Sequence, residues 1–394
     1  MKYIVSTILL LVITSGCTKQ VRNALPEEHV EIAQVVGFEQ VRDWGDEFSP
    51  YFQKDVVESH NQFRDSYPEI FNHPDHTIDI LTISGGGSYG AYGIGLLDGW
   101  SDKGDYPTFR LVTGISTGAL IAPFAFLGGK YLNIVSDFYL AATNDEVFKR
   151  KSIRNILFSD SVASSEPLQL KIEDAIDDEM IEKIAQEHKK GRRLFVGTTN
   201  LDARRLVIWN MGHIASIGGS DARELFHNII LASASIPVAL NPVYIPVEAN
   251  GVEYDEMHVD GGVNVEVFFY GNIIDVKSGR DEVVESFPEK VRIFIIRNSQ
   301  IETSYKPVEP RIVSVAKAAI SNLIGSQGVG DLYRIYAVSE RDEIDYNLAS
   351  IPADFKFQEN TGFDPVEMRK LYEVGYKEAI KGYKWGKTPP GFKE

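Results

Sequence analysis

The spacing of hydrophobic and polar residues predicts alternating strands and helices from about residue 76 onward. The β-branched run TIDILTIS predicts a strand over Ile78–Ile83, and the apolar residues Ala91–Trp100, which follow a run of glycines, predict a helix. The same order returns in FRLVTGI, a strand, and in STGALIAPFAFLGG, a helix rich in small residues. Strand, turn and helix repeated in this order predict a parallel sheet with crossover helices.

The rest of the chain carries further strands and helices. Helical periodicity dominates residues 131–190 and returns from residue 310 to the C-terminus. The segments RRLFVGTTN, RRLVIWN and VRIFIIRN predict strands, and SDARELFHNIILASAS predicts a helix that ends before Pro237. We therefore expect an α/β fold of three layers, α/β/α, with a mainly parallel central sheet and helical additions at both ends.

These patterns divide the chain into four segments. Residues 1–16 are expected to be a signal peptide, and residues 17–75 a tether and N-terminal extension with a helix near Val56–Tyr67. Residues 76–300 are expected to form the α/β domain, and residues 301–394 a helical C-terminal region packed on that domain.

The N-terminal segment has the layout of a secretory signal. Lys2 is followed by an apolar stretch from Tyr3 to Ile13 and then by small residues that lead to Cys17, the only cysteine in the chain. The apolar stretch is shorter than the roughly 20 residues that an ordinary membrane-spanning helix needs. The alternatives are an ordinary signal peptide with an incidental cysteine, or an uncleaved anchor.

This segment resembles a bacterial lipoprotein signal, although Thr14 stands where such signals usually have an aliphatic residue. The resemblance implies that Cys17 becomes the lipidated first residue of the mature protein and anchors it in a membrane of the cell envelope. Thr18 is not an aspartate. By analogy with Gram-negative sorting, this favours the outer membrane over the inner one.

Composition narrows the classes of partner. The formal net charge is -16, which argues against nucleic acid, because phosphate binding needs clustered Lys and Arg. No polybasic patch is available for anionic lipid headgroups. With Cys17 as the only cysteine, the fold holds without an internal disulfide. The sequence does not predict an oligomeric state.

The first candidate for chemistry is GISTG, from Gly114 to Gly118, which matches the pattern G-x-S-x-G. In this pattern the serine, here Ser116, sits on a sharp turn between strand and helix and acts as a nucleophile. The helix that follows points its free N–H groups at the reacting carbonyl. The alternative is a tight turn whose small residues allow close packing of helix and strand.

The second candidate is SGGGSYG, from Ser84 to Gly90, also between a strand and a helix. Consecutive glycines can aim backbone N–H groups at one anion, as an oxyanion hole requires. A phosphate loop does not fit, since no Lys-Ser or Lys-Thr pair follows the glycines. A dinucleotide fingerprint would leave GISTG unexplained. Gly85 lies one βαβ length before Ser116, so the two turns are expected side by side at one sheet edge.

A serine nucleophile needs a base within hydrogen-bond reach. The histidines after Ser116 are His188, His213, His227 and His258. His188 ends a highly charged helix and is expected to be solvated. His258 lies within a third candidate motif, MHVDGGVNVEVF. In this motif Asp260 precedes Gly261 and Gly262. A carboxylate on such a turn can reach a neighbouring hydroxyl, although a plain Asp-Gly-Gly turn is the alternative.

Together, SGGGSYG, GISTG and DGG resemble the patatin-like phospholipase family over about residues 78–265. The resemblance implies a patatin-like catalytic domain in which Ser116 is the nucleophile and Asp260 the general base. It also implies an oxyanion hole formed by the N–H groups of Gly85, Gly86 and Gly87. SASIPVALNPV, residues 233–243, is similar to a further stretch of the family.

The sequence departs from the family at two positions in the glycine turn. Tyr89 stands where the family usually has a basic residue, and Ser84 where an acid is often found. Main-chain donors survive both changes, so the oxyanion hole is expected to persist.

The resemblance implies hydrolysis of a phospholipid or other acyl lipid through an acyl-serine intermediate, with neither metal nor cofactor. Three alternatives stay open. The first is an acyltransferase on the same dyad, the second is a non-catalytic outer-membrane scaffold, and the third is a histidine-dependent hydrolase that uses His258 or His227.

Overall fold

The computed structural model describes residues 22–73, 75–151, 160–269, 273–274, 290–302, 305, 307–357 and 362–392. The predicted signal over residues 1–16 and the lipidation site Cys17 lie outside the described residues. None of the helices within the described ranges is long and apolar enough to cross a bilayer.

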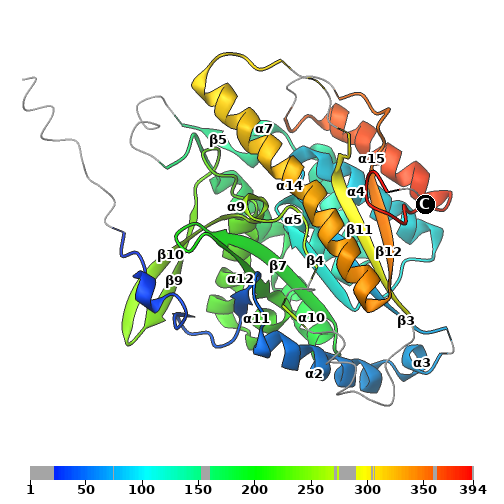
Figure 1. The fold of residues 1–394 in the computed structure, drawn as a ribbon, viewed down its shortest axis with the longest axis horizontal. Helices are drawn as coiled ribbons and strands as arrows, with labels where there is room; N and C mark the ends of the chain where they lie inside the picture. The colour runs from blue at the N-terminus through cyan, green and yellow to red at the C-terminus, as the bar shows by residue number, and fades with distance from the viewer. Residues whose placement is uncertain are drawn as a thin grey trace, which may run out of the picture.

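A ten-stranded sheet forms the centre of the molecule (Figure 1). Five neighbouring strands run parallel: β7 (Arg193–Asn200), β4 (Leu111–Ile115), β3 (Thr77–Ile83), β11 (Lys290–Gln300) and β12 (Ile344–Ile351). The other five join antiparallel: β8 (Arg205–Asn210), β10 (Val252–Asp260), β9 (Val243–Ala249), β1 (Gln34–Val35) and β2 (Arg42–Trp44). The short strands β5 (Lys149–Arg150) and β6 (Ala163–Ser164) pair separately.

Helices cover both faces of the sheet because its strands are apolar on both sides. In β3, Ile78 and Ile80 join one buried cluster, whereas Leu81 and Ile83 join the other. The first cluster lies under α2 (Pro50–Ser66) and α14 (Ile312–Asp342). The second lies under α4 (Gly90–Lys103), α5 (Thr117–Leu127), α6 (Lys130–Ala141), α9 (Glu166–Ala175), α10 (Asp178–Lys189), α11 (Met211–Ile217), α12 (Gly219–Ser233) and α15 (Pro365–Ile380).

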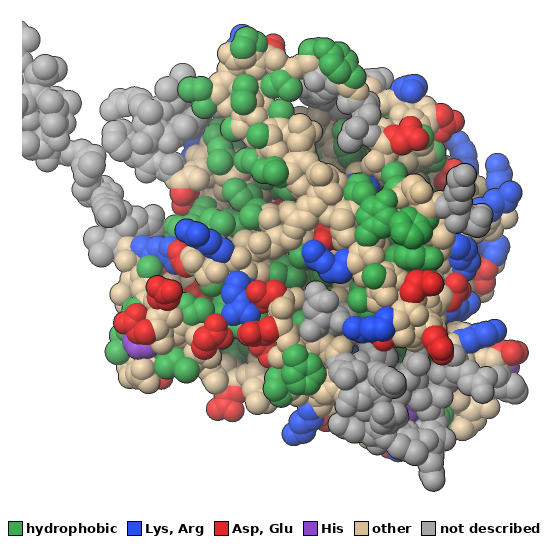
Figure 2. Space-filling model, in the orientation of Figure 1, with side chains coloured by type: hydrophobic (Ala, Val, Ile, Leu, Met, Phe, Trp, Pro, Cys, Tyr) green, Lys and Arg blue, Asp and Glu red, His purple; other side chains and the backbone are tan. Residues whose placement is uncertain are grey.

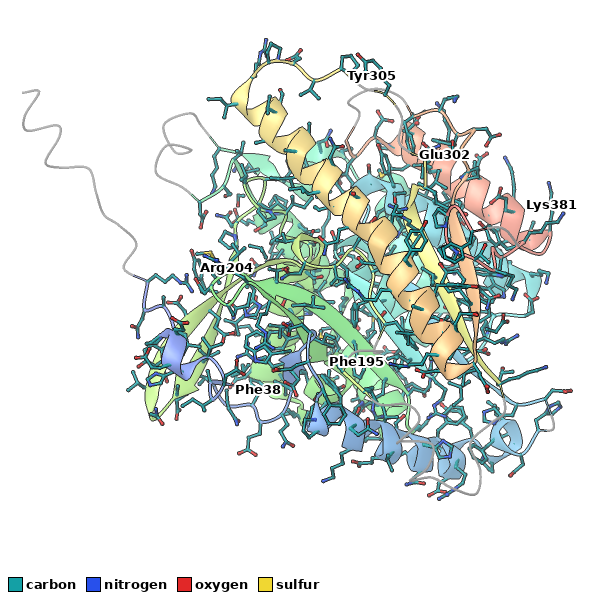
Figure 3. All side chains as sticks on the ribbon, in the orientation of Figure 1. Phe38, Phe195, Arg204, Glu302, Tyr305 and Lys381 are labelled. Atoms are coloured by element: carbon teal, nitrogen blue, oxygen red, sulfur yellow. The ribbon has the colours of Figure 1, made fainter. Side chains whose placement is uncertain are left out.

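Aromatic packing ties the α2 face to the sheet. Phe195 of β7, labelled in Figure 3, packs against Phe52 of α2 with ring centroids 5.0 Å apart. The short elements complete the description: α3 (Pro68–Phe71), α7 (Asn144–Val147), and three 3-10 turns, η1 (Glu27–His29), η2 (Gly87–Tyr89) and η3 (Gly261–Val263). The expected three-layer α/β/α architecture is therefore present.

Three details of the expected fold need correction. The sheet is mixed rather than mainly parallel, because β10 doubles back beside β7 and brings β9 and β1 with it. Residues 34–44 are not a tether, since β1 and β2 pair with β9 and β8. The C-terminal region is not wholly helical, because β12 extends the parallel part of the sheet beyond β11.

Candidate active site

Ser116 occupies a strained turn between β4 and α5. Its backbone has φ 55° and ψ -122°, a conformation that L-residues rarely adopt and that marks functional turns. Gly114 and Gly118, on either side of Ser116, must be glycines because backbone atoms lie where a Cβ would be. A Cβ on Gly118 would lie 2.0 Å from the carbonyl oxygen of Ile83, and one on Gly114 would lie 2.3 Å from that of Gly118. The G-x-S-x-G pattern therefore reflects close backbone packing on both sides of Ser116, which is itself buried.

The sheet topology brings the candidate nucleophile and base together. Along one side of β7, β4 pairs as far as Gly197, where Ile115 is the last partner. Strand β10 arrives from the opposite direction and pairs Asp260 with the next residue, Thr198. The two strands thus end head to head, and the Ser116 hydroxyl donates a hydrogen bond of 2.6 Å to Oδ2 of Asp260.

Asp260 is buried and held on both oxygens. Its carboxylate accepts the Ser116 hydroxyl on Oδ2 and the Gly262 N–H, at 2.7 Å, on Oδ1. Burial raises the pKa of Asp260 to about 6, and the two hydrogen bonds limit that rise. The group is therefore mostly ionised at neutral pH yet more basic than an exposed aspartate, as a general base requires.

The glycine turn lies beside Ser116, because β3 and β4 are parallel neighbours. Gly85 is not a free donor as expected: its N–H donates to the carbonyl oxygen of Glu266 at 3.1 Å. The N–H groups of Gly86 and Gly87 donate to no other group within the described part of the chain. The candidate oxyanion hole is therefore Gly86 and Gly87, and Gly85 serves to anchor the loop.

A family model for patatin-like phospholipase matches residues 81–269. This range contains the glycine turn, the serine turn and the Asp-Gly-Gly turn that the fold brings together. Residues 81–269 are thus similar to a patatin-like phospholipase domain, and in this structure they contribute to a mixed sheet with flanking helices.

Two solved structures resemble the chain at low identity. VipD from Legionella pneumophila matches with a TM-score of 0.35 and 12% identity, over 77% of this chain and 66% of that one. Human GIVD cytosolic phospholipase A2 matches with a TM-score of 0.30 and 10% identity, over 66% of this chain and 49% of that one. The chain thus spans just under two thirds of the first and half of the second. No curated protein sequence matches it.

Asn298, at the carboxyl end of β11, shapes the glycine turn of the patatin-like domain. Its carbonyl oxygen would lie 2.4 Å from a Cβ on Gly86, whose φ of 156° also favours glycine. Its backbone N–H donates to Oγ of Ser84, and its side-chain amide donates to the Ser84 carbonyl oxygen. The serine that replaces the family's acid is thus tied to β11. Tyr89, which replaces the basic residue, packs on Phe357 with ring centroids 4.3 Å apart.

Ser233 is a site residue whose role the sequence did not reveal. Its hydroxyl donates to the carbonyl oxygen of Gly197 at 2.7 Å and accepts the Ser116 N–H at 2.9 Å. Nearby, the carbonyl oxygen of Ser235 accepts the Asp260 N–H at 2.9 Å. The C-terminal end of α12 and the residues directly after it therefore position the backbones of both candidate catalytic residues.

The histidines take other roles. His258 is fully buried. Its Nδ1 is hydrogen-bonded to Oγ1 of Thr198 and its Nε2 to the carboxylate of Glu256, so both ring nitrogens already have partners. His227 lies against the carbonyl oxygen of Ile176. His188 is buried rather than solvated as expected, and burial is the main cause that lowers its pKa, to about 2. The hydrogen bond of Ser116 goes to Asp260 rather than to any of these rings.

Helix α14 crosses the front of the sheet in Figure 1 and carries Ile324 close to the Asp-Gly-Gly turn. Its N-terminal half exposes Ile312 and Leu323, which are 90% and 70% exposed. Figure 2 shows hydrophobic side chains gathered at the top of the molecule, where Figure 1 shows the N-terminal part of α14. Arg297 of β11 pairs with Glu266 at 3.3 Å and donates to the carbonyl oxygen of Gly325. This buried pair fixes α14 to the segment that anchors the glycine turn.

No group of three or more His, Cys, Asp or Glu in the described ranges has the arrangement of a metal site.

Proposed function

We propose that the chain is a serine lipid acyl hydrolase of the phospholipase or lysophospholipase type that uses Ser116 and Asp260 as a dyad. The observation that carries this proposal is the 2.6 Å hydrogen bond between the Ser116 hydroxyl and a buried carboxylate whose pKa lies near 6. A base near that pKa can accept the serine proton at neutral pH without an imidazole.

The reaction proceeds in two displacements. Asp260 takes the hydroxyl proton as Oγ of Ser116 attacks the ester carbonyl carbon, and the negative charge that develops on the carbonyl oxygen is held by the N–H groups of Gly86 and Gly87. Protonated Asp260 then gives its proton to the leaving lysolipid alkoxide, which leaves an acyl-Ser116. In the second step Asp260 takes a proton from water, which attacks the acyl carbon. The fatty acid departs and the proton returns to Ser116.

The direct test is hydrolysis of phospholipids, lysophospholipids and triglycerides by the purified chain, with products identified by mass. We expect Ser116→Ala and Asp260→Asn each to lower turnover at least about a hundredfold, the scale of a lost nucleophile or base. Ser220→Ala and Asp178→Asn are matched controls, because both residues lie exposed on helices away from the dyad. Unchanged thermal unfolding temperatures would show that folding is intact.

The same assay separates the alternatives. Transfer of the acyl group to an added alcohol in preference to water would make the chain an acyltransferase. Wild-type protein that releases no fatty acid from any substrate, despite native folding, would make it a scaffold and contradict the proposal.

We also propose that Cys17 carries a lipid anchor that holds the domain at the envelope, on the strength of the sequence leading to it. In a bacterial host fed labelled palmitate, the wild-type chain should incorporate label and fractionate with membranes. Cys17→Ser should incorporate no label and lose at least about nine tenths of its membrane association. Without the lipid, the short apolar N-terminal stretch would be the remaining attachment, and a single attachment of this kind binds a membrane weakly. Equal labelling of both chains would contradict the anchor.

A further inference from the structure

Glu266 anchors the glycine turn through its backbone rather than through its side chain. Its carbonyl oxygen accepts the N–H of Gly85 at 3.1 Å. A Cβ on Gly85 would lie 3.2 Å from the Cβ of Ser116, so this glycine lies directly against the candidate nucleophile. The position of the Glu266 carbonyl therefore sets where the turn that carries Gly86 and Gly87 begins.

The peptide group that carries this carbonyl is held from its other side by Asp331 of α14. Oδ2 of Asp331 accepts the Glu266 N–H at 2.8 Å and, less closely, the Val267 N–H at 3.5 Å. The Val267 N–H and the Glu266 carbonyl belong to one planar trans peptide group and point in opposite directions. Asp331 and Gly85 therefore hold the two ends of the same peptide group.

Helix α14 packs directly against Glu266. Gly325, Gly328 and Asp331 are spaced three residues apart, which makes them neighbours along the helix surface. A Cβ on Gly328 would lie 1.4 Å from Oε2 of Glu266, so a larger residue there would displace that carboxylate. Arg297 donates to the carbonyl oxygen of Gly325 and pairs with Glu266. These contacts keep α14 next to the segment whose backbone Asp331 holds.

Asp331 is a charged group buried against this backbone, with 1% of the residue exposed. Burial raises its pKa to about 6, and the Glu266 N–H and the nearby charge of Arg334 limit that rise, so the carboxylate is mostly ionised at neutral pH. Its other oxygen, Oδ1, lies 3.3 Å from Nη1 of Arg334. Removing the carboxylate would leave the Glu266 N–H buried without this acceptor, which a backbone donor tolerates poorly.

We propose that Asp331 is a positioning residue for the candidate oxyanion hole. It fixes the peptide group between Glu266 and Val267, whose carbonyl oxygen retains the glycine turn. The N–H groups of Gly86 and Gly87 thereby stay in place for the oxyanion that develops on the substrate. This inference rests on the proposed function, because it assigns a support to the proposed hydrolysis. It also gives a part in the site to α14, which lies outside residues 81–269 that the family model matches.

The test replaces Asp331 in the purified full chain in three ways. Asp331→Ala removes the acceptor, and Asp331→Leu removes it while keeping the site filled. Asp331→Asn loses the charge but keeps one acceptor oxygen for the Glu266 N–H. Asp342→Ala is the matched control, because Asp342 is also a buried aspartate of α14 that pairs with an arginine, Arg341, and it lies about 16 Å further along the helix.

Two properties of each variant are measured. The first is kcat and KM for p-nitrophenyl butyrate, and the second is the inhibition constant of an alkyl trifluoromethyl ketone, which forms an oxyanion on the serine without being turned over. We expect Asp331→Ala and Asp331→Leu each to lower kcat at least about tenfold and to weaken the inhibitor by a similar factor, with KM within about twofold of wild type. Support of the oxyanion acts in the transition state, which is why kcat rather than KM should change. Asp331→Asn should keep kcat within about threefold of wild type, and Asp342→Ala within about twofold.

The outcomes separate the two proposals. If wild type hydrolyses neither this ester nor any phospholipid, the proposed function is wrong and the inference falls with it. If wild type is active and Asp331→Ala keeps its kcat and its affinity for the inhibitor, Asp331 does not position the hole, while the proposed function stands. A loss in Asp331→Asn as large as that in Asp331→Ala would also overturn the inference, because the acceptor oxygen would then not be the feature that matters. Should Asp331→Ala fail to fold by circular dichroism, Asp331→Leu decides by the same criteria.

Discussion

At the scale of single residues, the site depends on what surrounds one carboxylate. Burial raises the pKa of Asp260 to about 6, and hydrogen bonds from Ser116 and Gly262 keep it from rising further. A carboxyl group with this pKa is protonated and inactive as a base at pH 5, and ionised at pH 7. Activity that depends on it must therefore rise with pH through about 6.

The resemblance of the three glycine-rich motifs to the patatin-like family implied Ser116 and Asp260 as partners, and the structure brings their side chains within hydrogen-bond distance. Two features of the site could not be predicted from the motifs. The N–H of Gly85 donates to the carbonyl oxygen of Glu266, a residue distant in sequence. Asn298 of β11 donates from its side-chain amide to the carbonyl oxygen of Ser84 in the same turn. Contacts of this kind depend on the tertiary fold, to which no local pattern points.

At the scale of elements, short β-branched runs and helices bounded by glycines were predicted well. The expected strand over Ile78–Ile83 is β3, Thr77–Ile83, and the expected helix over Ala91–Trp100 is α4, Gly90–Lys103. The hairpin of β9 and β10 could have been predicted from the sequence, because an Asn-Gly pair separates the two strands. Asn250 and Gly251 form its turn with φ of 54° and 76°, as a two-residue hairpin of the Asn-Gly type requires.

The close contact of α5 with β3 gives a prediction at this scale. Gly118→Ala would push a methyl group to 2.0 Å from the Ile83 carbonyl oxygen, so something must shift. We expect a loss of at least about 2 kcal/mol in the free energy of unfolding, together with displacement of Ser116 and reduced activity. Urea unfolding followed by circular dichroism measures the change.

Gly330 of α14 is the matched control for this substitution. A Cβ at Gly330 meets nothing within 4 Å, and the residue is exposed inside a helix. Gly330→Ala should therefore raise the free energy of unfolding by up to about 1 kcal/mol, since alanine is the better helix former. If both variants shifted stability in the same direction, close backbone packing would not be the reason for glycine at position 118.

At the scale of the whole molecule, the alternation of strands and helices in the sequence predicted the three-layer arrangement. It did not predict the strands at the edges of the sheet, β1, β2 and β12. Strands β1 and β2 have two and three residues, too few to show a pattern, and pair with strands more than a hundred residues away in the chain. Strand β12 follows a long helix and alternates polar with apolar residues only in part. Whether such a short segment becomes an edge strand depends on the strand it pairs with in the folded sheet, and its own sequence does not reveal that partner.

The same scale explains why the dyad forms at all. The candidate base comes from an antiparallel strand that approaches β7 from the opposite end, and the nucleophile from a parallel strand that stops where the other arrives. A purely parallel sheet would not bring the end of β10 to the end of β4. The mixed topology, which the sequence did not predict, is therefore what gives the site its geometry.

The measurement that bears most directly on the central claim is the rate at which a fluorophosphonate labels Ser116, followed from pH 5 to pH 8 in wild type and Asp260→Asn. The label reports serine reactivity without any lipid substrate. For wild type we expect the rate to rise about tenfold per pH unit below pH 6 and to level off above about pH 7, as Asp260 ionises. Asp260→Asn should label at least about a hundredfold more slowly at pH 7.5, with no inflection near pH 6. An Asp260→Asn profile that matched wild type would show that another group activates Ser116.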